Sequence, residues 1–169
     1  MGSFGNVRTR PNEPPMPEPL AYFLTWTTYG SWLPGDERGW VLKGRGFKLP
    51  DVALCEAARV LLTETPCLLD ADQRLLVEQT IRDHCRIRKW ELHAVNCQTN
   101  HVHAVVAANK GAVHVRNELK AWCTRKLKER QAPVGHAIRE NWWTEGGSQR
   151  FIGDQLSLEA TVGYVVDGQ

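Results

Sequence analysis

The chain of 169 residues has an ordinary apolar content and a net charge of only +2, values that suit one domain with its own core. That charge is too small to predict a nucleic-acid partner by itself, and five cysteines without a Cys-x-x-Cys pair argue against a disulfide framework or a thiolate zinc site. No apolar stretch is long enough to span a membrane, and the N-terminus lacks a signal-peptide core. We therefore expect a cytoplasmic protein in a reducing compartment.

The first fifty residues predict a tail, a strand and a long loop. Residues 1–19 hold five prolines and little to bury, so they predict a flexible tail before a single domain at 20–169. Residues 20–28 are rich in aromatic and β-branched side chains on both faces, which is typical of a central strand. Residues 31–50 are rich in Gly and Pro and predict a loop, and a loop of this length is often functional.

Two helices are predicted next. Asp51 can cap the first, which runs to about Thr63 and carries an apolar stripe of Leu54, Ala57, Ala58 and Leu61. Asp70 and Gln73 resemble a capping box at the start of the second. His84 lies on the apolar stripe of this second helix, which favours a hydrogen-bonded core histidine over a metal ligand.

An antiparallel hairpin is predicted from residues 90–98 and 101–108, joined by a tight turn at Thr99-Asn100. Strict alternation would place Leu92, Ala94 and Asn96 on one face of the first strand. His101 and His103 share one face of the second, and two imidazoles side by side can hold one divalent metal. An incidental pair is the alternative, and His93 would add a ligand only if its face matched, which depends on the strand register.

The residues from 113 to 130 predict a third helix, which is the most basic element in the chain. A solvated face is one interpretation, and a surface that follows a phosphate backbone is the other. The candidate DNA contacts on this helix are Arg116, Lys120, Arg125, Lys126, Lys128 and Arg130. Tryptophans outside the core could stack unpaired bases, and the candidates are Trp32, Trp40, Trp142 and Trp143.

The C-terminal part predicts strand fragments at 142–143 and 149–152 and a last helix at about 154–169. Gly163 in this helix indicates either close helix packing or the close approach of a ligand. The order of elements is strand, helices, strand, strand, helix, strand and helix. This order predicts an α+β ferredoxin-like sandwich with a central antiparallel sheet, helices on one face and an additional C-terminal helix.

Four features together resemble the single-tyrosine HUH transposases of small insertion sequences, and most closely the REP-associated tyrosine transposases. They are TWTTYGSWLPGD at 25–36, NHVH at 100–103, GSQRF at 147–151 and the single tyrosine of the last helix, Tyr164. The resemblance covers roughly residues 20–169. It implies a ferredoxin-like core, a Mg²⁺ or Mn²⁺ ion held by His101 and His103, and Tyr164 as the nucleophile.

The resemblance also implies a third metal ligand, Gln or Asn, one turn after the tyrosine. That position is Gly168, which has no side chain to offer, so Gln169 is the first candidate and Asp167 the second. The implied substrate is single-stranded DNA that forms a hairpin, cleaved through a 5′-phosphotyrosine intermediate. Arg150 of the GSQRF segment joins Trp32 and the basic helix as an expected DNA contact. The family includes monomers and swapped homodimers, and the implied location is the bacterial nucleoid.

The chemistry agrees with these residue types. A phenol has a pKa of about 10 and is a poor nucleophile unless it is activated, and a divalent metal can polarise a phosphate oxygen and orient it for in-line attack. A hydrolase with a His-x-His-x-His motif is set aside because position 105 is Val105. A non-catalytic RNA-binding module, a nicking replication initiator or relaxase, and a domesticated relic remain alternatives.

Overall fold

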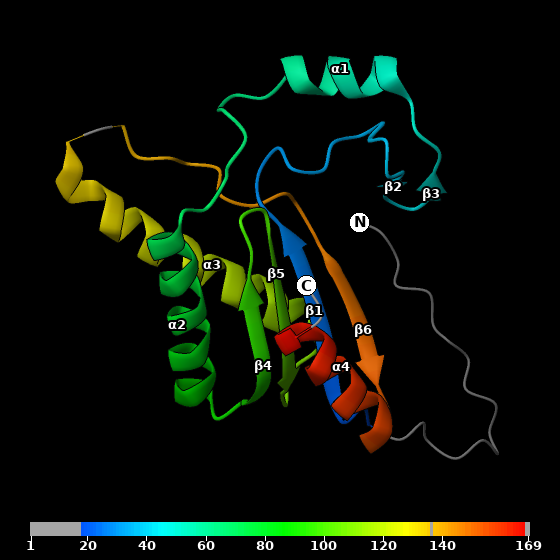
Figure 1. Ribbon diagram of the computed structural model, residues 1–169, viewed down its shortest axis with the longest axis vertical. Coiled ribbons are helices and arrows are strands. Elements are labelled where there is room, and N and C mark those ends of the chain that lie inside the picture. Colours follow the sequence, from blue (N-terminus) through cyan, green and yellow to red (C-terminus); the bar gives the residue numbers. More distant parts are fainter. Residues whose placement is uncertain (1–17, 136, 168–169) are drawn as a thin grey trace, which may run out of the picture.

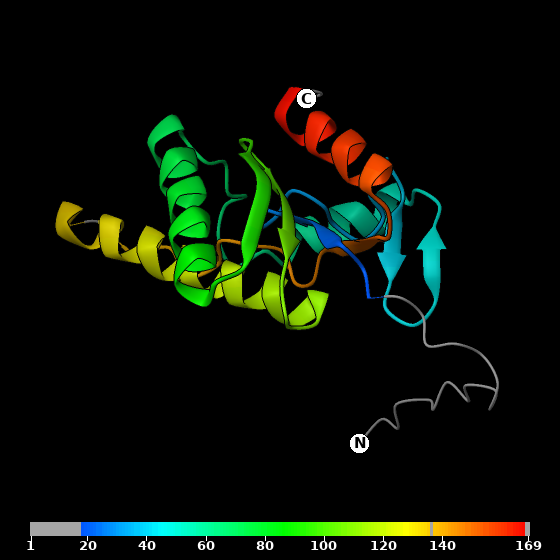
Figure 2. The ribbon, with the colours of Figure 1, turned by 90° about the horizontal axis from the view of Figure 1, so that it is seen from below.

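The computed structural model describes residues 18–135 and 137–167, so most of the predicted tail and Gln169 lie outside the described residues. Strands β1 (Ala21–Thr27), β4 (Glu91–Cys97), β5 (His101–Ala107) and β6 (Ser148–Ile152) form one antiparallel sheet in the order β4-β5-β1-β6. Helices α2 (Ala71–Arg88) and α3 (Ala112–Gln131) cover one face, and α4 (Gln155–Asp167) lies on the other (Figures 1 and 2). The predicted α+β ferredoxin-like sandwich with an added C-terminal helix is confirmed.

Strand β1 is central, as its two apolar faces predict. It pairs with β5 on one side and with β6 on the other. Leu24 and Trp26 are fully buried in the core beneath α2 and α3, whereas Phe23 packs against the smaller apolar cluster under α4. This one strand therefore contributes side chains to the apolar clusters on both faces of the sheet.

The second predicted helix forms as its sequence indicates. Asp70 and Gln73 make the complete capping box at the start of α2. His84 is buried, its Nε2 lies 2.7 Å from Glu118 Oε1, and its ring packs against the rings of Trp90 and Trp122. The expectation of a hydrogen-bonded core histidine is confirmed.

Strand β4 departs from strict alternation. Its register with β5 shifts between Leu92 and Ala94, so His93 occupies a bulge. Leu92 therefore packs with the large core under α2 and α3, while Ala94 joins the cluster under α4. The prediction that Leu92, Ala94 and Asn96 share one face is wrong for Leu92, because the extra residue reverses the alternation.

The predicted loop at 31–50 contains a short hairpin, β2 (Trp40–Leu42) and β3 (Gly46–Lys48). Helix α1 (Val52–Val60) follows and begins at the predicted cap, since Asp51 Oδ1 accepts a hydrogen bond from the Leu54 amide at 3.0 Å. The helix ends before the predicted Thr63. None of its residues is buried, and its predicted apolar stripe faces solvent because α1 lies beyond the end of the sheet (Figure 1).

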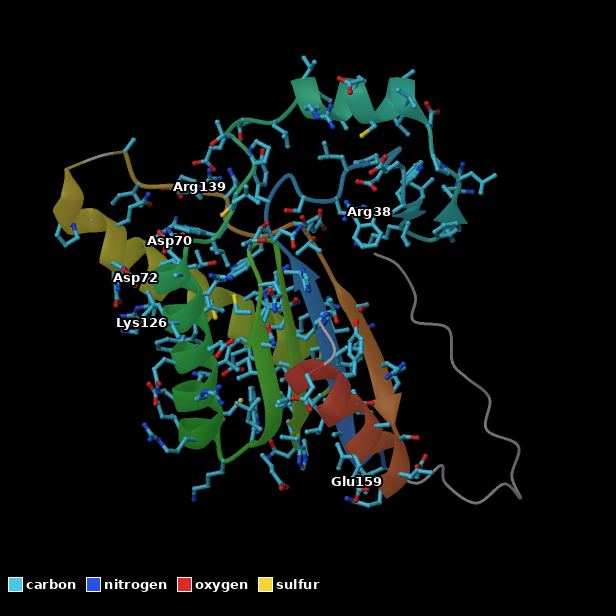
Figure 3. All side chains as sticks on the ribbon, viewed as in Figure 1. Arg38, Asp70, Asp72, Lys126, Arg139 and Glu159 are labelled. Atoms are coloured by element: carbon cyan, nitrogen blue, oxygen red, sulfur yellow. The ribbon has the colours of Figure 1, made fainter. Side chains whose placement is uncertain are left out.

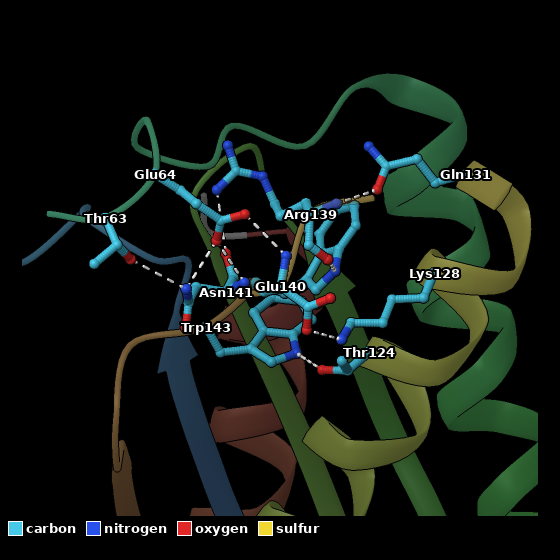
Figure 4. A network of polar contacts seen from close by, with 10 residues as sticks. Thr63, Glu64, Thr124, Lys128, Gln131, Arg139, Glu140, Asn141 and Trp143 are labelled. Atoms are coloured by element: carbon cyan, nitrogen blue, oxygen red, sulfur yellow. Dashed lines mark hydrogen bonds and ion pairs between the residues drawn. The ribbon is translucent and has the colours of Figure 1, made fainter. Parts of the chain in front are cut away.

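The predicted strand fragment at 142–143 is reduced to one isolated bridge between Trp143 and Thr28. This segment follows a 3-10 helix (Ala132–Val134) and is held by Glu64, whose carboxylate accepts hydrogen bonds from the amides of Glu140 and Asn141 and from Asn141 Nδ2 (Figure 4). These bonds lower the pKa of Glu64, the largest contribution coming from the Glu140 amide. They anchor the chain that leads into β6.

Among the helices formed by residues 18–135 and 137–167, none combines the length and the hydropathy needed to cross a membrane.

Candidate active site

The two motif histidines lie together on the face of the sheet that α4 covers. His101 and His103 project from β5, and their ring centroids are 4.8 Å apart. The period of two residues along a strand produces this placement. The side-by-side arrangement predicted for the two imidazoles is therefore present.

A protein partner holds Nδ1 of each ring. His103 Nδ1 lies 2.7 Å from the Thr25 hydroxyl, and His101 Nδ1 lies 2.8 Å from Asn100 Oδ1. Because a carboxamide oxygen only accepts, His101 Nδ1 carries the proton in that bond. Metal-binding histidines commonly use such bonds to fix their orientation, with the second ring nitrogen directed to the ion.

Burial, together with a smaller contribution from the nearby charge of His101, lowers the pKa of His103 to about 4. His103 is therefore neutral near pH 7. A neutral imidazole has the lone pair that a metal ligand needs. The donor chemistry of this histidine pair therefore fits a divalent metal.

Tyr164 lies over the same histidines. The centroid of its ring is 5.9 Å from that of His103 and 6.2 Å from that of Phe23, and half of the residue is exposed. It comes from the last turns of α4, whose buried residues Thr161 and Val165 pack toward the sheet. The structure thus brings the candidate nucleophile to the histidines of its own chain.

Arg150 also lies at this face. It sits opposite Phe23 in the β1–β6 register, with its guanidinium carbon 5.2 Å from the Phe23 ring centroid. Its Nη2 donates to the Thr161 hydroxyl at 3.3 Å. The Phe23 ring also contacts the rings of His103 and Tyr164, so Arg150 brings an exposed cation to this cluster, where it can neutralise charge on a bound phosphate.

Sequence reasoning did not identify Thr25, Phe23 or Asn96 as members of the site. Thr25 and Asn96 lie directly opposite His103 in the two neighbouring strands. A polar residue inside an apolar strand was the available signal. The register that brings it to the histidines is a tertiary property.

The described part of the chain brings no third His, Cys, Asp or Glu side chain to the histidine pair. Within residues 18–135 and 137–167 there is no group of three or more His, Cys, Asp or Glu side chains that could hold a metal. Asp167 is an exposed residue at the end of α4, and His93 Nδ1 lies 3.8 Å from Glu91. Gln169, the first candidate, lies outside the described residues.

The six cations of α3 are not equivalent. Arg116 is buried and donates from Nη1 to Gln149 Oε1, and Lys120 donates from Nζ to the carbonyls of Thr144 and Gly146 at 2.7 and 2.8 Å. Both tie α3 to the chain around β6. The other four cations form ion pairs that are exposed or partly exposed. Arg125 and Lys126 pair with Glu129, Lys128 pairs with Glu140, and Arg130 pairs with Asp72.

The four candidate tryptophans divide between surface and core. Trp142 is buried, and Trp143 is partly buried with its Nε1 donating to Thr124 Oγ1 at 3.0 Å. Trp40 is partly exposed, and Trp32 is 40% exposed in the segment that leads to β2. Of the four, Trp32 is the most accessible to a nucleic-acid base.

The chain was also compared with known proteins and solved structures. The chain is similar in fold to the solved structure of a REP-associated tyrosine transposase bound to a REP hairpin, with 13% identity, a TM-score of 0.50, and coverage of 93% of this chain and 70% of that chain. It is also similar to a candidate transposase from Deinococcus radiodurans, with 14% identity, a TM-score of 0.45, and coverage of 93% of this chain and 95% of that chain. No curated protein matches the chain.

A family model described as "Transposase IS200 like" matches residues 57–167, well over half of the chain. The matched segment contains both histidines, Arg150 and Tyr164. The chain therefore belongs to the IS200-like transposase family.

Proposed function

We propose that this protein cuts and rejoins single-stranded DNA beside hairpins, with Tyr164 as the nucleophile and His101 and His103 as ligands of Mg²⁺ or Mn²⁺. The observation that carries the proposal is the contact of the Tyr164 and His103 rings, with centroids 5.9 Å apart. It links an exposed phenol to a pair of side-by-side imidazoles on one face of the sheet. The transposase family of the chain and its similarity in fold to a hairpin-bound transposase support the same reaction class.

In the proposed reaction, the Tyr164 oxygen attacks the phosphorus of a phosphodiester and loses its proton. A bond forms between this oxygen and phosphorus, and the bond to the 3′ oxygen breaks, so the products are a 5′-phosphotyrosine and a free 3′-hydroxyl. A second 3′-hydroxyl can reverse the step and regenerate the phenol. Strands are then rejoined without ATP because the energy of the phosphodiester is retained in the covalent bond.

The remaining residues serve binding and orientation. His101 and His103 would hold the metal, which when bound supplies charge stabilisation at the phosphate oxygens. Arg150, above Phe23, would contact a non-bridging oxygen as a hydrogen-bond donor. Thr25 and Asn100 keep the two imidazoles oriented.

The third ligand stays a prediction, with Gln169 preferred to Asp167. Either side chain would suit the site because Mg²⁺ prefers oxygen ligands, which the two imidazoles do not supply. The resemblance implies a ligand at the position of Gly168, and its absence from the sequence there favours the second candidate function, a DNA-binding relic with weakened cleavage.

The proposal is tested with labelled hairpins from DNA flanking the gene, incubated with Mn²⁺ and separated on denaturing gels with and without protease. Wild-type protein should form a protease-sensitive adduct, while Tyr164→Phe and His101→Ala should form none. Tyr22→Phe is the matched control, because Tyr22 lies in β1 and packs against Phe151 rather than His103. Hairpin binding without an adduct in the wild type would reject the cleavage mechanism and favour the relic.

A further inference from the structure

Residues 31–48, here called the arm, present aromatic rings to solvent at the end of the sheet where the histidine strand begins. Trp32 is 40% exposed and Phe47 is 64% exposed. The amide of Thr28 donates to the Asn100 carbonyl at 2.9 Å, so the chain enters the arm directly beside the turn that precedes His101. In Figure 1 the arm and α1 lie beyond this end of the sheet, and Figure 3 labels Arg38 within it.

The exposed ring of Phe47 packs against the backbone of Gly39. Gly39 has φ +81°, and a Cβ at that position would overlap the Phe47 ring, so the ring lies directly against the glycine. The hairpin register pairs Phe47 with Val41 on the neighbouring strand. An aromatic ring that is exposed and already ordered loses little conformational entropy when a flat ligand stacks on it.

Trp32 is held by a separate set of contacts. Its Nε1 donates to the Gly39 carbonyl at 2.7 Å, and the Arg38 guanidinium lies 4.7 Å from its ring centroid. Arg38 in turn binds both carboxylate oxygens of Asp36 at 2.7 Å and the Ser31 carbonyl at 2.6 Å. These hydrogen bonds lower the pKa of Asp36, which keeps the carboxylate charged and Arg38 fixed over the ring.

The hairpin of the arm carries unpaired positive charge. Between Trp40 and Lys48 the chain contains Lys43, Arg45 and Lys48 and no acidic residue. Within residues 18–135 and 137–167, no acidic side chain forms a salt bridge with any of the three, in contrast to the cations of α3. Lys43 and Arg45 are exposed at the tip of this hairpin.

We infer that the arm binds the unpaired nucleotides next to the hairpin, with bases stacked on Phe47 and Trp32 and phosphates beside Lys43, Arg45 and Lys48. Unpaired strands are bound by this combination of aromatic rings and cations, because every base has a π face and every linkage a negative charge. A second copy of the chain is a poorer partner, since it would bring the same three cations to the interface. The inference rests on the proposed function and adds a subsite for the strand that enters or leaves the site.

The arm precedes the segment that matches the family model, which begins at residue 57. The test of this inference measures DNA binding and not cleavage. It uses the Tyr164→Phe protein, for which no adduct is expected. Three fluorescein-labelled probes are compared by anisotropy: a blunt hairpin, the hairpin with a 3′ oligo-dT tail, and the hairpin with a 5′ oligo-dT tail. If the cleavage proposal fails, the anisotropy assay still measures binding by the arm. If the arm does not bind the tails, the adduct assay still tests cleavage.

Phe47→Leu should weaken binding of one tailed hairpin about tenfold and leave the blunt hairpin unchanged. Phe47→Trp should restore binding because it restores a stacking surface. Phe151→Leu is the matched control, since Phe151 has the same exposed fraction of 64% but lies on β6. Lys43→Gln with Arg45→Gln should reduce the salt dependence of tail binding, whereas Lys89→Gln on the distant end of α2 should not.

Three results would overturn the inference. The first is that the Phe47→Leu protein binds each tailed probe as tightly as the Phe151→Leu protein does. The second is equal weakening on blunt and tailed probes, which would make the arm a duplex contact. The third is a loss of dimer in sedimentation without a change in DNA binding, which would make it a self-association surface. Thermal unfolding of each variant verifies that the arm variants remain folded.

Discussion

Asn96 donates a hydrogen bond from Nδ2 to the backbone carbonyl of Val165, with 3.1 Å between the two atoms. Val165 follows Tyr164 in the last turn of α4, where helix carbonyls lack an intrahelical partner. Asn96 also lies opposite His103 in the β4–β5 register, and its Oδ1 accepts from Gln98 Nε2 at 2.7 Å. Asn96 thus joins β4, the strand paired with the histidine strand β5, to the helix turn that carries the tyrosine.

We expect Asn96→Ala to lower the rate of adduct formation about tenfold at saturating DNA, with a smaller change in DNA affinity. The reason is that Asn96 acts as a positioning residue for Tyr164, and misplacement of a nucleophile lowers kcat more than binding. Single-turnover cleavage with Mn²⁺ provides the rate, and anisotropy provides the affinity. Gln98→Ala, which removes only the hydrogen bond from Gln98 Nε2 to Asn96 Oδ1, should lower the rate less. An unchanged rate in Asn96→Ala would refute this role.

Metal binding should be measurable without DNA. Mn²⁺ at a hundredfold excess over its Kd should stabilise the folded protein by about 2.7 kcal/mol, seen as a rise in Tm. His101→Ala and His103→Ala should remove this rise. His114→Ala, a change at an exposed histidine of α3 that pairs with Glu118, should keep it. A Mn²⁺-dependent Tm that survives in both site variants would place the metal elsewhere.

Arg150 should contribute to cleavage more than to folding. Arg150→Gln should reduce single-turnover cleavage about tenfold or more, because a hydrogen-bonding cation is lost beside the phosphate, and Arg150→Lys should recover part of the rate. Arg86→Gln on the exposed side of α2 is the control. Cleavage by Arg150→Gln at the wild-type rate would show that the guanidinium serves only to cover Phe23.

The cations of α3 should separate into two classes. Lys120→Met should destabilise the fold by about 1–2 kcal/mol because the carbonyls of Thr144 and Gly146 lose their donor, and urea unfolding measures this. Arg125→Gln and Arg130→Gln should leave stability nearly unchanged, since exposed ion pairs contribute little. If Arg125 and Arg130 contact phosphates, each substitution should reduce the slope of log K for DNA binding against log salt concentration by about 1. An unchanged slope would mean that α3 is a solvated face.

Glu64 makes a pH-dependent contribution to stability. Its pKa is lowered in the folded protein, so its contribution is present above its unfolded pKa and is lost as the pH falls through the folded value. Glu64→Gln should cost about 1 kcal/mol near pH 7, and the difference from wild type should shrink as the solution becomes acidic. Urea unfolding at neutral and acid pH measures this difference. Glu56→Gln, which removes an exposed pair with Arg59, should show little difference at either pH.

Several features followed from the sequence because their physical causes are local. The capping residues Asp51 and Asp70 bind amides three residues away, and the period of a strand places His101 and His103 on one face whatever their surroundings. The order of the elements was sufficient to predict the ferredoxin-like sheet. The two apolar faces of residues 20–28 were sufficient to predict that β1 is a central strand.

Other features depend on contacts between distant segments. The bulge at His93 and the register that sets Thr25 and Asn96 opposite His103 result from packing across the sheet, and a shift of one residue would reverse every face. Whether a cation of α3 turns inward, as Arg116 and Lys120 do, depends on acceptors of the chain around β6. The sequence by itself determined the helices and the four strands of the main sheet, with the chemical groups they carry, but not the β2–β3 hairpin. The tertiary structure alone decided which groups meet, because side-chain direction is periodic along one element whereas proximity depends on the packing of several.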